Sequence, residues 1–180
     1  MKINRLLFAL TLALSPVLST AEDGNDLFAA ASTGKFERVQ ALLAQGIDVN
    51  SKIEQDRTPL MAASFNGNLR IIKLLMGYGA NVNLADKLGS TALSDAVLFG
   101  NADAVKLLIV AGANVNAADS QNATILDKAK KIGRADIIKL LEDAGAKVAE
   151  AATENNPAAA TEALPDSQPA AEDKPAEPNP

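Results

Sequence analysis

The apolar positions of residues 57–79 follow the period of two short helices. Leu60 and Ala63 fall on one face of the first helix, and Ile71 and Leu75 fall on one face of the second. Each helix therefore has one apolar stripe that must be buried. The pattern predicts a pair of short antiparallel helices.

Residue types at the ends of these two helices support this prediction. Thr58 is a good N-cap because its hydroxyl can accept a hydrogen bond from a free backbone N–H, and Pro59 suits the first helical position. Gly67 and Gly79 suit the helix ends, where a left-handed backbone conformation favours glycine. Residues 80–90 have no helical period and contain turn-forming residues, so we expect an extended finger loop there.

The same features recur along the chain at a fixed step of 33 residues. A period that is kept over several columns without an insertion is typical of a solenoid of stacked repeats. The columns are Gly34, Gly67, Gly100 and Gly133; Gly46, Gly79, Gly112 and Gly145; Thr58, Thr91 and Thr124; and Leu42, Leu75, Leu108 and Leu141.

The units at the two ends of this array depart from the pattern. An end unit lacks a neighbour on one side, and each side chain of Leu or Ile size left exposed there forgoes about 1.5–3 kcal/mol. The last unit carries Lys128 and Lys130 where inner units carry small or apolar residues, and Glu142 where they carry Met or Ile. The first unit begins at Asn25, which we expect to cap its first helix. The sequence therefore predicts an array that is complete at four units.

The repeated stretches resemble the ankyrin repeat family. The stretch DRTPLMAASFNGNLRIIKLLMGYGANVNLAD at 56–86 is similar to the family consensus along its whole length, and KLGSTALSDAVLFGNADAVKLLIVAGANVNAAD at 87–119 nearly so. The resemblance implies an all-α ankyrin-repeat solenoid of four helix-turn-helix units with finger loops. It also implies a concave face, formed by the first helices and the finger tips, that binds other proteins.

The family's usual histidine after Thr-Pro-Leu is absent from all four units. The residues in its place are Phe28, Met61, Ser94 and Asp127. We therefore expect the hydrogen bond that this histidine makes between repeats to be missing throughout the array.

The sequence divides into three parts of different composition. The middle part carries the repeats, and the last part is rich in Ala, Pro and Glu without an apolar period, which is typical of a disordered tail. The predicted boundaries are 1–21 for a signal peptide, 22–148 for the repeat domain, with units at about 23–52, 53–85, 86–118 and 119–148, and 149–180 for the tail.

The first 21 residues have the features of a secretory signal peptide. Lys2 and Arg5 precede an apolar run at 6–14, and small residues lead up to Ala21. The alternative is a retained membrane anchor, but this run is well short of the roughly 20 apolar residues that a spanning helix needs. We therefore expect cleavage after Ala21, a bacterial exported protein in the periplasm, and no stable membrane insertion.

Composition argues against several classes of function. The sequence has no histidine and no cysteine, so it lacks the commonest general base, the usual transition-metal ligands and every thiol nucleophile. The predicted repeat domain carries 14 basic and 15 acidic residues, scattered rather than gathered into a basic face. We expect no catalytic residues, no cofactor, no bound metal and no nucleic-acid partner.

Candidate contact residues are those that the repeat pattern leaves free. Three apolar residues stand just before the glycines that end the first helices, and two more stand at a helix end and at a finger tip. Aromatic residues dominate protein interfaces, so these are the predicted anchors, with polar finger residues as a rim. The alternatives are that some anchors, Leu98 above all, turn inward and that the finger residues are ordinary solvated loops. The candidates are Phe65, Leu98, Phe99, Tyr78 and Leu88 as anchors, and Arg57, Lys87 and Gln121 as rim residues.

The functional hypothesis from the sequence is a monomeric periplasmic module that binds another protein. It would act as an adaptor or as an inhibitor. By resemblance, examples are an accessory factor for a periplasmic enzyme in peroxide tolerance and an immunity protein against a toxin. The alternative is an envelope-structural or spacer protein in which the acidic tail carries the role.

Overall fold

The computed structural model describes residues 20–149, which form eight α-helices and one short 3-10 helix. The predicted signal peptide, apart from its last two residues, and residues 150–180 of the predicted tail lie outside this part. The helices are α1 (Thr20–Ser32), α2 (Phe36–Ala44), α3 (Pro59–Phe65), α4 (Leu69–Gly77), α5 (Ala92–Leu98), α6 (Ala102–Val110), α7 (Ile125–Ile132) and α8 (Ala135–Asp143), with the 3-10 helix η1 (Glu54–Asp56) between α2 and α3.

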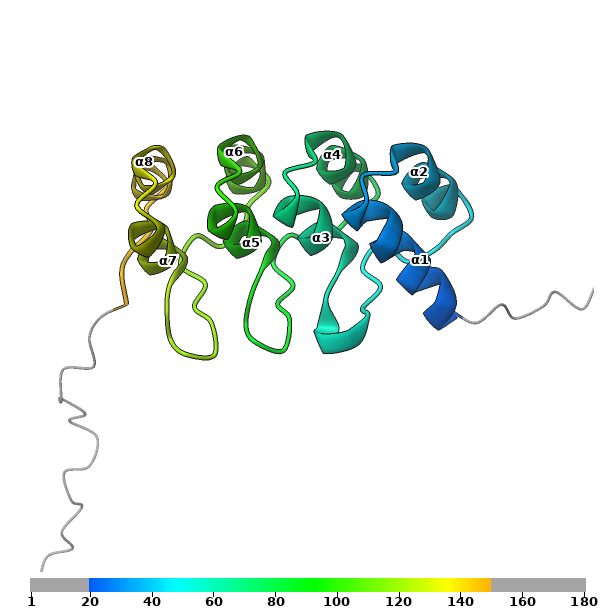
Figure 1. The fold of residues 1–180 in the computed structure, drawn as a ribbon, viewed down its shortest axis with the longest axis horizontal. Helices are drawn as coiled ribbons and strands as arrows, with labels where there is room; N and C mark the ends of the chain where they lie inside the picture. Colours follow the sequence, from blue (N-terminus) through cyan, green and yellow to red (C-terminus); the bar gives the residue numbers. More distant parts are fainter. Residues whose placement is uncertain (1–19, 150–180) are drawn as a thin grey trace, which may run out of the picture. The chain divides into compact units, whose positions relative to one another are not determined.

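The eight helices form four antiparallel pairs that stack in chain order (Figure 1). The first helices of the pairs, α1, α3, α5 and α7, pack side by side in one row, and α2, α4, α6 and α8 form a second row, which lies above the first in this view. Finger loops between the pairs extend away from both rows. The predicted all-α solenoid of four helix-turn-helix units is therefore confirmed.

Aliphatic side chains fill the space between the pairs. Leu42, Leu75, Leu108 and Leu141 are all buried, each one repeat after the last. Burial of a leucine side chain contributes about 1.5–3 kcal/mol, and here each leucine is covered by its own unit and by its neighbours. The core is therefore a continuous seam that no single unit could close alone.

Threonine residues cap the N-termini of α3, α5 and α7, as the sequence predicts. The hydroxyls of Thr58, Thr91 and Thr124 each accept a hydrogen bond, 3.2–3.3 Å long, from the backbone N–H three residues later. Ser94 and Asp127 complete a reciprocal capping box, because their side-chain oxygens accept from the backbone N–H of the capping threonine. Residues at the family's histidine position thus stabilise their own helix start.

Side-chain amides link each unit to the next at one end of the helices. Asn50 Nδ2 donates to Gly79 O at 3.4 Å, and its Oδ1 accepts from Asn81 N at 2.8 Å. Asn83 and Asn116 repeat this pair of bonds in the next two units. Hydrogen bonds therefore join the repeats, although not through the histidine position.

A second set of hydrogen bonds joins the units at the opposite end of the helices. Asn101 Nδ2 donates to Ser64 O at 3.0 Å and to Phe65 O at 2.9 Å, where α3 ends. Arg134 makes an equivalent bond to Gly100 O at 3.1 Å in the next unit. Carbonyls at a helix C-terminus lack partners within the helix, so these bonds both end the helix and bind the units together.

The finger loops pack closely on one another. Ser120 N donates to Leu88 O at 2.9 Å, which joins the tips of two successive fingers. Gly89 has a φ of +76°, and a Cβ added there would lie 2.9 Å from the Asp119 Cα. A side chain at Gly89 would therefore strain the backbone and push the two fingers apart.

The expectation that Asn25 caps the first helix is wrong. Helix α1 begins at Thr20, and Asn25 lies in its interior with an exposed side chain. The residues before Asn25 are compatible with a helix, because alanine and glutamate favour helix and the acids Glu22 and Asp23 suit a first turn. A capping preference at one residue therefore does not by itself fix where this helix begins.

We expect the substitution Asn101→Ala to lower the free energy of unfolding by about 1–2 kcal/mol, because it removes two inter-unit hydrogen bonds and leaves Phe65 O without its donor, whereas Ser64 O keeps the Gly67 N–H. Urea denaturation measures the change. Asn25→Ala is the matched control and should stay within about 0.5 kcal/mol of wild type. Equal losses in the two variants would contradict both the inter-unit bond and the placement of Asn25.

Candidate functional site

Exposed apolar side chains lie at the C-terminal ends of α3, α5 and α7. Phe65, Leu98, Phe99 and Ile132 are each between 39% and 51% exposed, and they occupy the last position of α3, α5 or α7 or the cap that follows. None of them contributes to the buried seam. We call these four residues the apolar strip.

The two phenylalanines of the apolar strip lie in contact across two units. Their ring centroids are 3.7 Å apart, and the ring planes are inclined at 42°. Phe65 and Phe99 are 34 residues apart, so one turns toward the other diagonally between α3 and α5. The hydrogen bond from Asn101 to Phe65 O fixes the backbone beneath this pair. The pair is thus held in place before any partner arrives.

A groove continues the apolar strip toward the last unit. It lies between α5 and α7 and has a volume of about 500 Å³, within the usual range of ligand-binding clefts. Leu98 and Ile132 form part of its wall, and the finger residues Ser90, Gln121 and Ala123 line it as well. We call it the α5–α7 groove.

Charged residues also line the α5–α7 groove, and the fold neutralises most of them. Lys128 Nζ lies 2.9 Å from Asp119 Oδ2. The other oxygen of Asp119 accepts from the backbone N–H groups of Gln121 and Ala123 at 2.9 and 3.0 Å. The hydrogen bond from Lys128 is the main reason why the pKa of Asp119 is lowered. Asp119 therefore shapes its finger as a carboxylate.

The Arg57 side chain holds two carboxylates from the next unit. Its Nη1 lies 3.2 Å from Asp86 Oδ2, and its Nη2 lies 2.9 Å from Asp95 Oδ2. Only 23% of the Arg57 side chain is exposed, compared with 5% for Asp86 and 7% for Asp95. The cluster joins the finger of the second unit to the finger and the inner helix of the third.

Asp95 is the acid of this cluster whose pKa is shifted by its burial. Its Oδ2 is close to Arg57 but makes no well-aligned hydrogen bond, because the arginine donates to Oδ1 at a longer distance of 3.4 Å. Burial is the largest influence and raises the pKa of Asp95, whereas the charge of Arg57 acts in the opposite direction. The cluster binds the units together while it keeps one carboxylate poorly solvated.

The structure brings together some of the predicted contact residues and separates others. Phe65, Leu98 and Phe99 lie together in the apolar strip, and Leu98 is exposed rather than turned inward. Gln121 lines the adjoining groove. Arg57 is bound to two carboxylates, so its charge is used within the fold.

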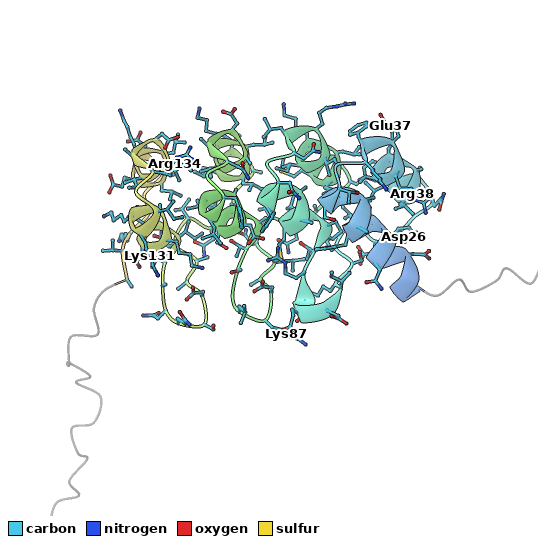
Figure 2. The ribbon with its side chains drawn as sticks, in the orientation of Figure 1. Asp26, Glu37, Arg38, Lys87, Lys131 and Arg134 are labelled. Carbon is cyan, nitrogen blue, oxygen red and sulfur yellow. The ribbon has the colours of Figure 1, made fainter. Side chains whose placement is uncertain are left out.

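The remaining predicted residues lie elsewhere. Lys87 and Leu88 are exposed on a finger, and Figure 2 shows Lys87 at its tip. Tyr78 is exposed, but it caps the C-terminal end of α4. Because α4 runs antiparallel to α3, Tyr78 lies at the opposite end of the helices from Phe65. The predicted anchors therefore do not form a single patch.

Sequence analysis missed Ile132 as a contact candidate. It precedes Gly133 in the same way that Phe99 precedes Gly100, so the repeat step marks its position. Lys128 and Lys130 favoured the interpretation of α7 as the polar, solvent-facing helix of a terminal unit. The structure instead places Ile132 across the α5–α7 groove from Leu98.

The described residues contain neither a metal site nor a membrane span. In residues 20–149, no three or more acidic side chains gather in a way that could hold a metal ion. Over the same part of the chain, no helix has the length and apolar character needed to cross a bilayer.

Comparison with known families agrees with the stacked helix pairs. A family model for ankyrin repeats (3 copies) matches residues 10–86, 27–119 and 61–152. The chain belongs to the ankyrin repeat family. Ankyrin repeats generally mediate protein–protein interaction and are typically not enzymes. No curated protein matches the chain.

We expect Asp95→Asn to change how the stability of the ankyrin domain depends on pH. A carboxyl whose pKa is raised in the folded state binds its proton more tightly there, so its contribution to stability falls as the pH rises from the unfolded pKa, about 3.9, to the folded pKa. The free energy of unfolding of wild type minus that of Asp95→Asn should therefore decrease over this mildly acidic interval. Urea denaturation at a series of pH values measures it.

Asp119→Asn provides a comparison of opposite sign. The pKa of Asp119 is lowered, so its stabilisation is present above the unfolded pKa and is lost as the pH falls through the folded pKa. The corresponding difference for Asp119→Asn should therefore increase with pH, over an interval below about pH 4. The same sign for both differences would contradict the environment described for Asp95.

Proposed function

We propose that this chain is a periplasmic module that binds another protein and acts as its adaptor or inhibitor. The family supports binding of a protein rather than catalysis. The location rests on the first 21 residues, whose basic start, short apolar run and small residues before Glu22 are typical of a cleaved signal peptide.

The observation that carries this proposal is the contact between Phe65 and Phe99 on the surface. Both rings are more than a third exposed, although the aliphatic seam is complete without them. Exposed aromatic pairs fixed on rigid helices suit the centre of an interface, because they gain contact area with little loss of conformational entropy. The apolar strip therefore supports binding of a protein surface by apolar burial.

The strip favours adaptor or inhibitor roles because it carries contact groups and no reaction centre. A partner that covers the strip also covers the C-terminal ends of α3, α5 and α7. An accessory factor of a periplasmic enzyme in peroxide tolerance and an immunity protein that masks a toxin both fit such a surface. The partner's identity would distinguish between them.

We expect the double substitution Phe65→Ser and Phe99→Ser to weaken partner capture by at least tenfold, because it removes two apolar anchors. The melting temperature should change by only a few degrees, since both rings are largely outside the core. Crosslinking in the intact envelope, followed by mass spectrometry, measures capture. The domain's own unfolding curve measures stability.

Val110→Ser is the matched control for this experiment. Val110 is 85% exposed at the end of α6, so it tests loss of an exposed apolar side chain away from the strip. Capture that survives the double substitution but is lost when residues 150–180 are deleted would favour the envelope-spacer alternative. A fall of more than about ten degrees in Tm would assign the rings to the core.

We expect the mature protein to begin at Glu22. Cleavage after Ala21 would leave α1 with its residues from Glu22 to Ser32. N-terminal sequencing of the protein from a periplasmic fraction checks this expectation. An intact Met1 on protein from the cytoplasmic fraction would contradict the location and leave the binding role to be judged on the capture experiment.

A further inference from the structure

Charged side chains at the floor of the α5–α7 groove form one network. Arg57 lies 3.2 Å from Asp86 and 2.9 Å from Asp95, and Lys128 lies 2.9 Å from Asp119. Asp95, Asp119 and Lys128 line the groove. Burial raises the pKa of Asp95, and the nearby charges of Arg57 and Lys128 oppose this effect, so the two groups of charges are within electrostatic reach of each other. All these side chains are at most 23% exposed.

The network has one negative charge in excess. It holds three carboxylates and two cations, because Arg57 is shared between Asp86 and Asp95. The deficit falls on Asp95, whose Oδ2 is buried and makes no well-aligned hydrogen bond. A buried charge with an incomplete partner is unfavourable, and a further cation next to Asp95 would relieve this.

The other charged residues of the groove do not correct the excess. Asp127 and Lys131 stand one helical turn apart on α7 and carry opposite charges, so together they add no net charge. Lys131 is exposed on α7, as Figure 2 shows. The lining as a whole therefore has three carboxylates against two ammonium groups. Clefts with apolar walls and an excess of one charge attract groups of the opposite charge.

We propose that the α5–α7 groove binds a basic segment of the partner protein, with an arginine or lysine beside Asp95 and a bulky apolar side chain between Leu98 and Ile132. The proposal rests on the protein-binding function argued above and specifies the partner's chemistry. The groove volume of about 500 Å³ accommodates a short peptide stretch. The cation supplies the positive charge that the network lacks, and the apolar walls strengthen its attraction to the carboxylates.

The aromatic pair beside the groove favours the same chemistry. Phe65 and Phe99 are exposed, and Phe99 follows Leu98, which lines the groove. Aromatic rings attract ammonium and guanidinium groups over their faces. The chain makes this contact elsewhere, since the Arg70 guanidinium lies 4.3 Å from the centre of the Phe36 ring. A second basic residue of the bound segment therefore has a favourable position next to the groove.

An acidic segment fits this groove less well. It would add a further negative charge to a network that already has one in excess. Lys128 is held by Asp119, and the attraction of Lys131 is reduced by Asp127 one turn away. The charges of the groove therefore select for a basic segment.

A phage-displayed library of random dodecapeptides, selected on the full chain, tests this chemistry. We expect enriched peptides to combine a Leu, Ile or Phe with at least one flanking Arg or Lys. The most enriched peptide is then synthesised with a fluorescent label, and its Kd is measured by anisotropy. Replacing its basic residues by Gln should weaken binding about tenfold, and raising the salt concentration should also weaken it.

Three variants of the chain locate the peptide in the groove. Asp95→Asn should weaken binding about tenfold through the lost charge, and Leu98→Ser should weaken it about tenfold through lost apolar contact. Lys131→Met should tighten binding by about twofold, because it removes a competing cation. Weaker binding by Lys131→Met would show that the peptide pairs with Lys131 and would contradict the proposal.

The matched controls are Asp103→Asn, an exposed carboxylate on α6, and Val110→Ser. Both should leave the Kd within about twofold of wild type. Urea denaturation shows whether each variant is folded at the temperature of the measurement. Leu98→Ser and Lys131→Met change exposed side chains, so they test the groove even if Asp95→Asn destabilises the domain.

The pH dependence of the Kd gives a second measurement of the role of Asp95. Burial raises the pKa of Asp95, so binding of the basic peptide should tighten as the pH rises through this pKa and the carboxylate forms. The charged groups that face Asp95 are Arg57, Asp86 and Lys128, and Asp95→Asn leaves all three in place. The difference between wild type and Asp95→Asn therefore isolates the titration of Asp95.

Selected peptides without a basic residue, no enrichment of any peptide, or binding unaffected by both Asp95→Asn and Leu98→Ser would overturn the proposal. Sedimentation that shows a dimer dissociated by these substitutions would also overturn it, because a second copy would then occupy the groove. Each result is distinct from failure of the proposed function. That function fails if Phe65→Ser with Phe99→Ser leaves envelope capture unchanged, whatever peptides are selected.

Discussion

Burial of the aliphatic seam between neighbouring helix pairs is the constraint on which the rest of the structure depends. Helices of seven to nine residues, such as α3 and α4, are too short to be stable alone in water. They become stable because residues such as Leu75 and Leu108 are covered from both sides. The stability of the fold is thus a sum of contacts within each unit and contacts between neighbouring units.

This constraint does not involve the C-terminal ends of α3, α5 and α7, which remain exposed. The seam contains the apolar side chains that face the neighbouring units. The side-chain amides of Asn66 and Asn101 donate hydrogen bonds to carbonyls at the helix ends of the preceding unit. Phe65, Phe99 and Ile132 are therefore not needed to complete the core, although they stand on helices held rigidly by it. A rigid support with unburied apolar groups binds a partner without a large ordering cost.

The step of 33 residues was sufficient to predict the four helix pairs, the threonine caps of the last three pairs and the fingers, because each depends on residues within one unit or at the same place in the next. It was not sufficient for features that depend on where side chains point between units. The diagonal contact of Phe65 with Phe99 and the burial of Arg57 against Asp95 are of this kind. Asn25 was misplaced because the capping preference of a single residue did not outweigh the helix-forming residues before it.

The ion pairs of two successive fingers show that one carboxylate position takes its cation from different elements. Asp86 and Asp119 occupy the same repeat position, and each accepts two backbone N–H groups that shape its finger. The cation that neutralises each one differs, since Arg57 comes from the preceding finger whereas Lys128 comes from the helix that follows. The fold therefore requires the carboxylate but not a particular source of positive charge. The two fingers thus keep the same backbone geometry although different elements supply the neighbouring cation.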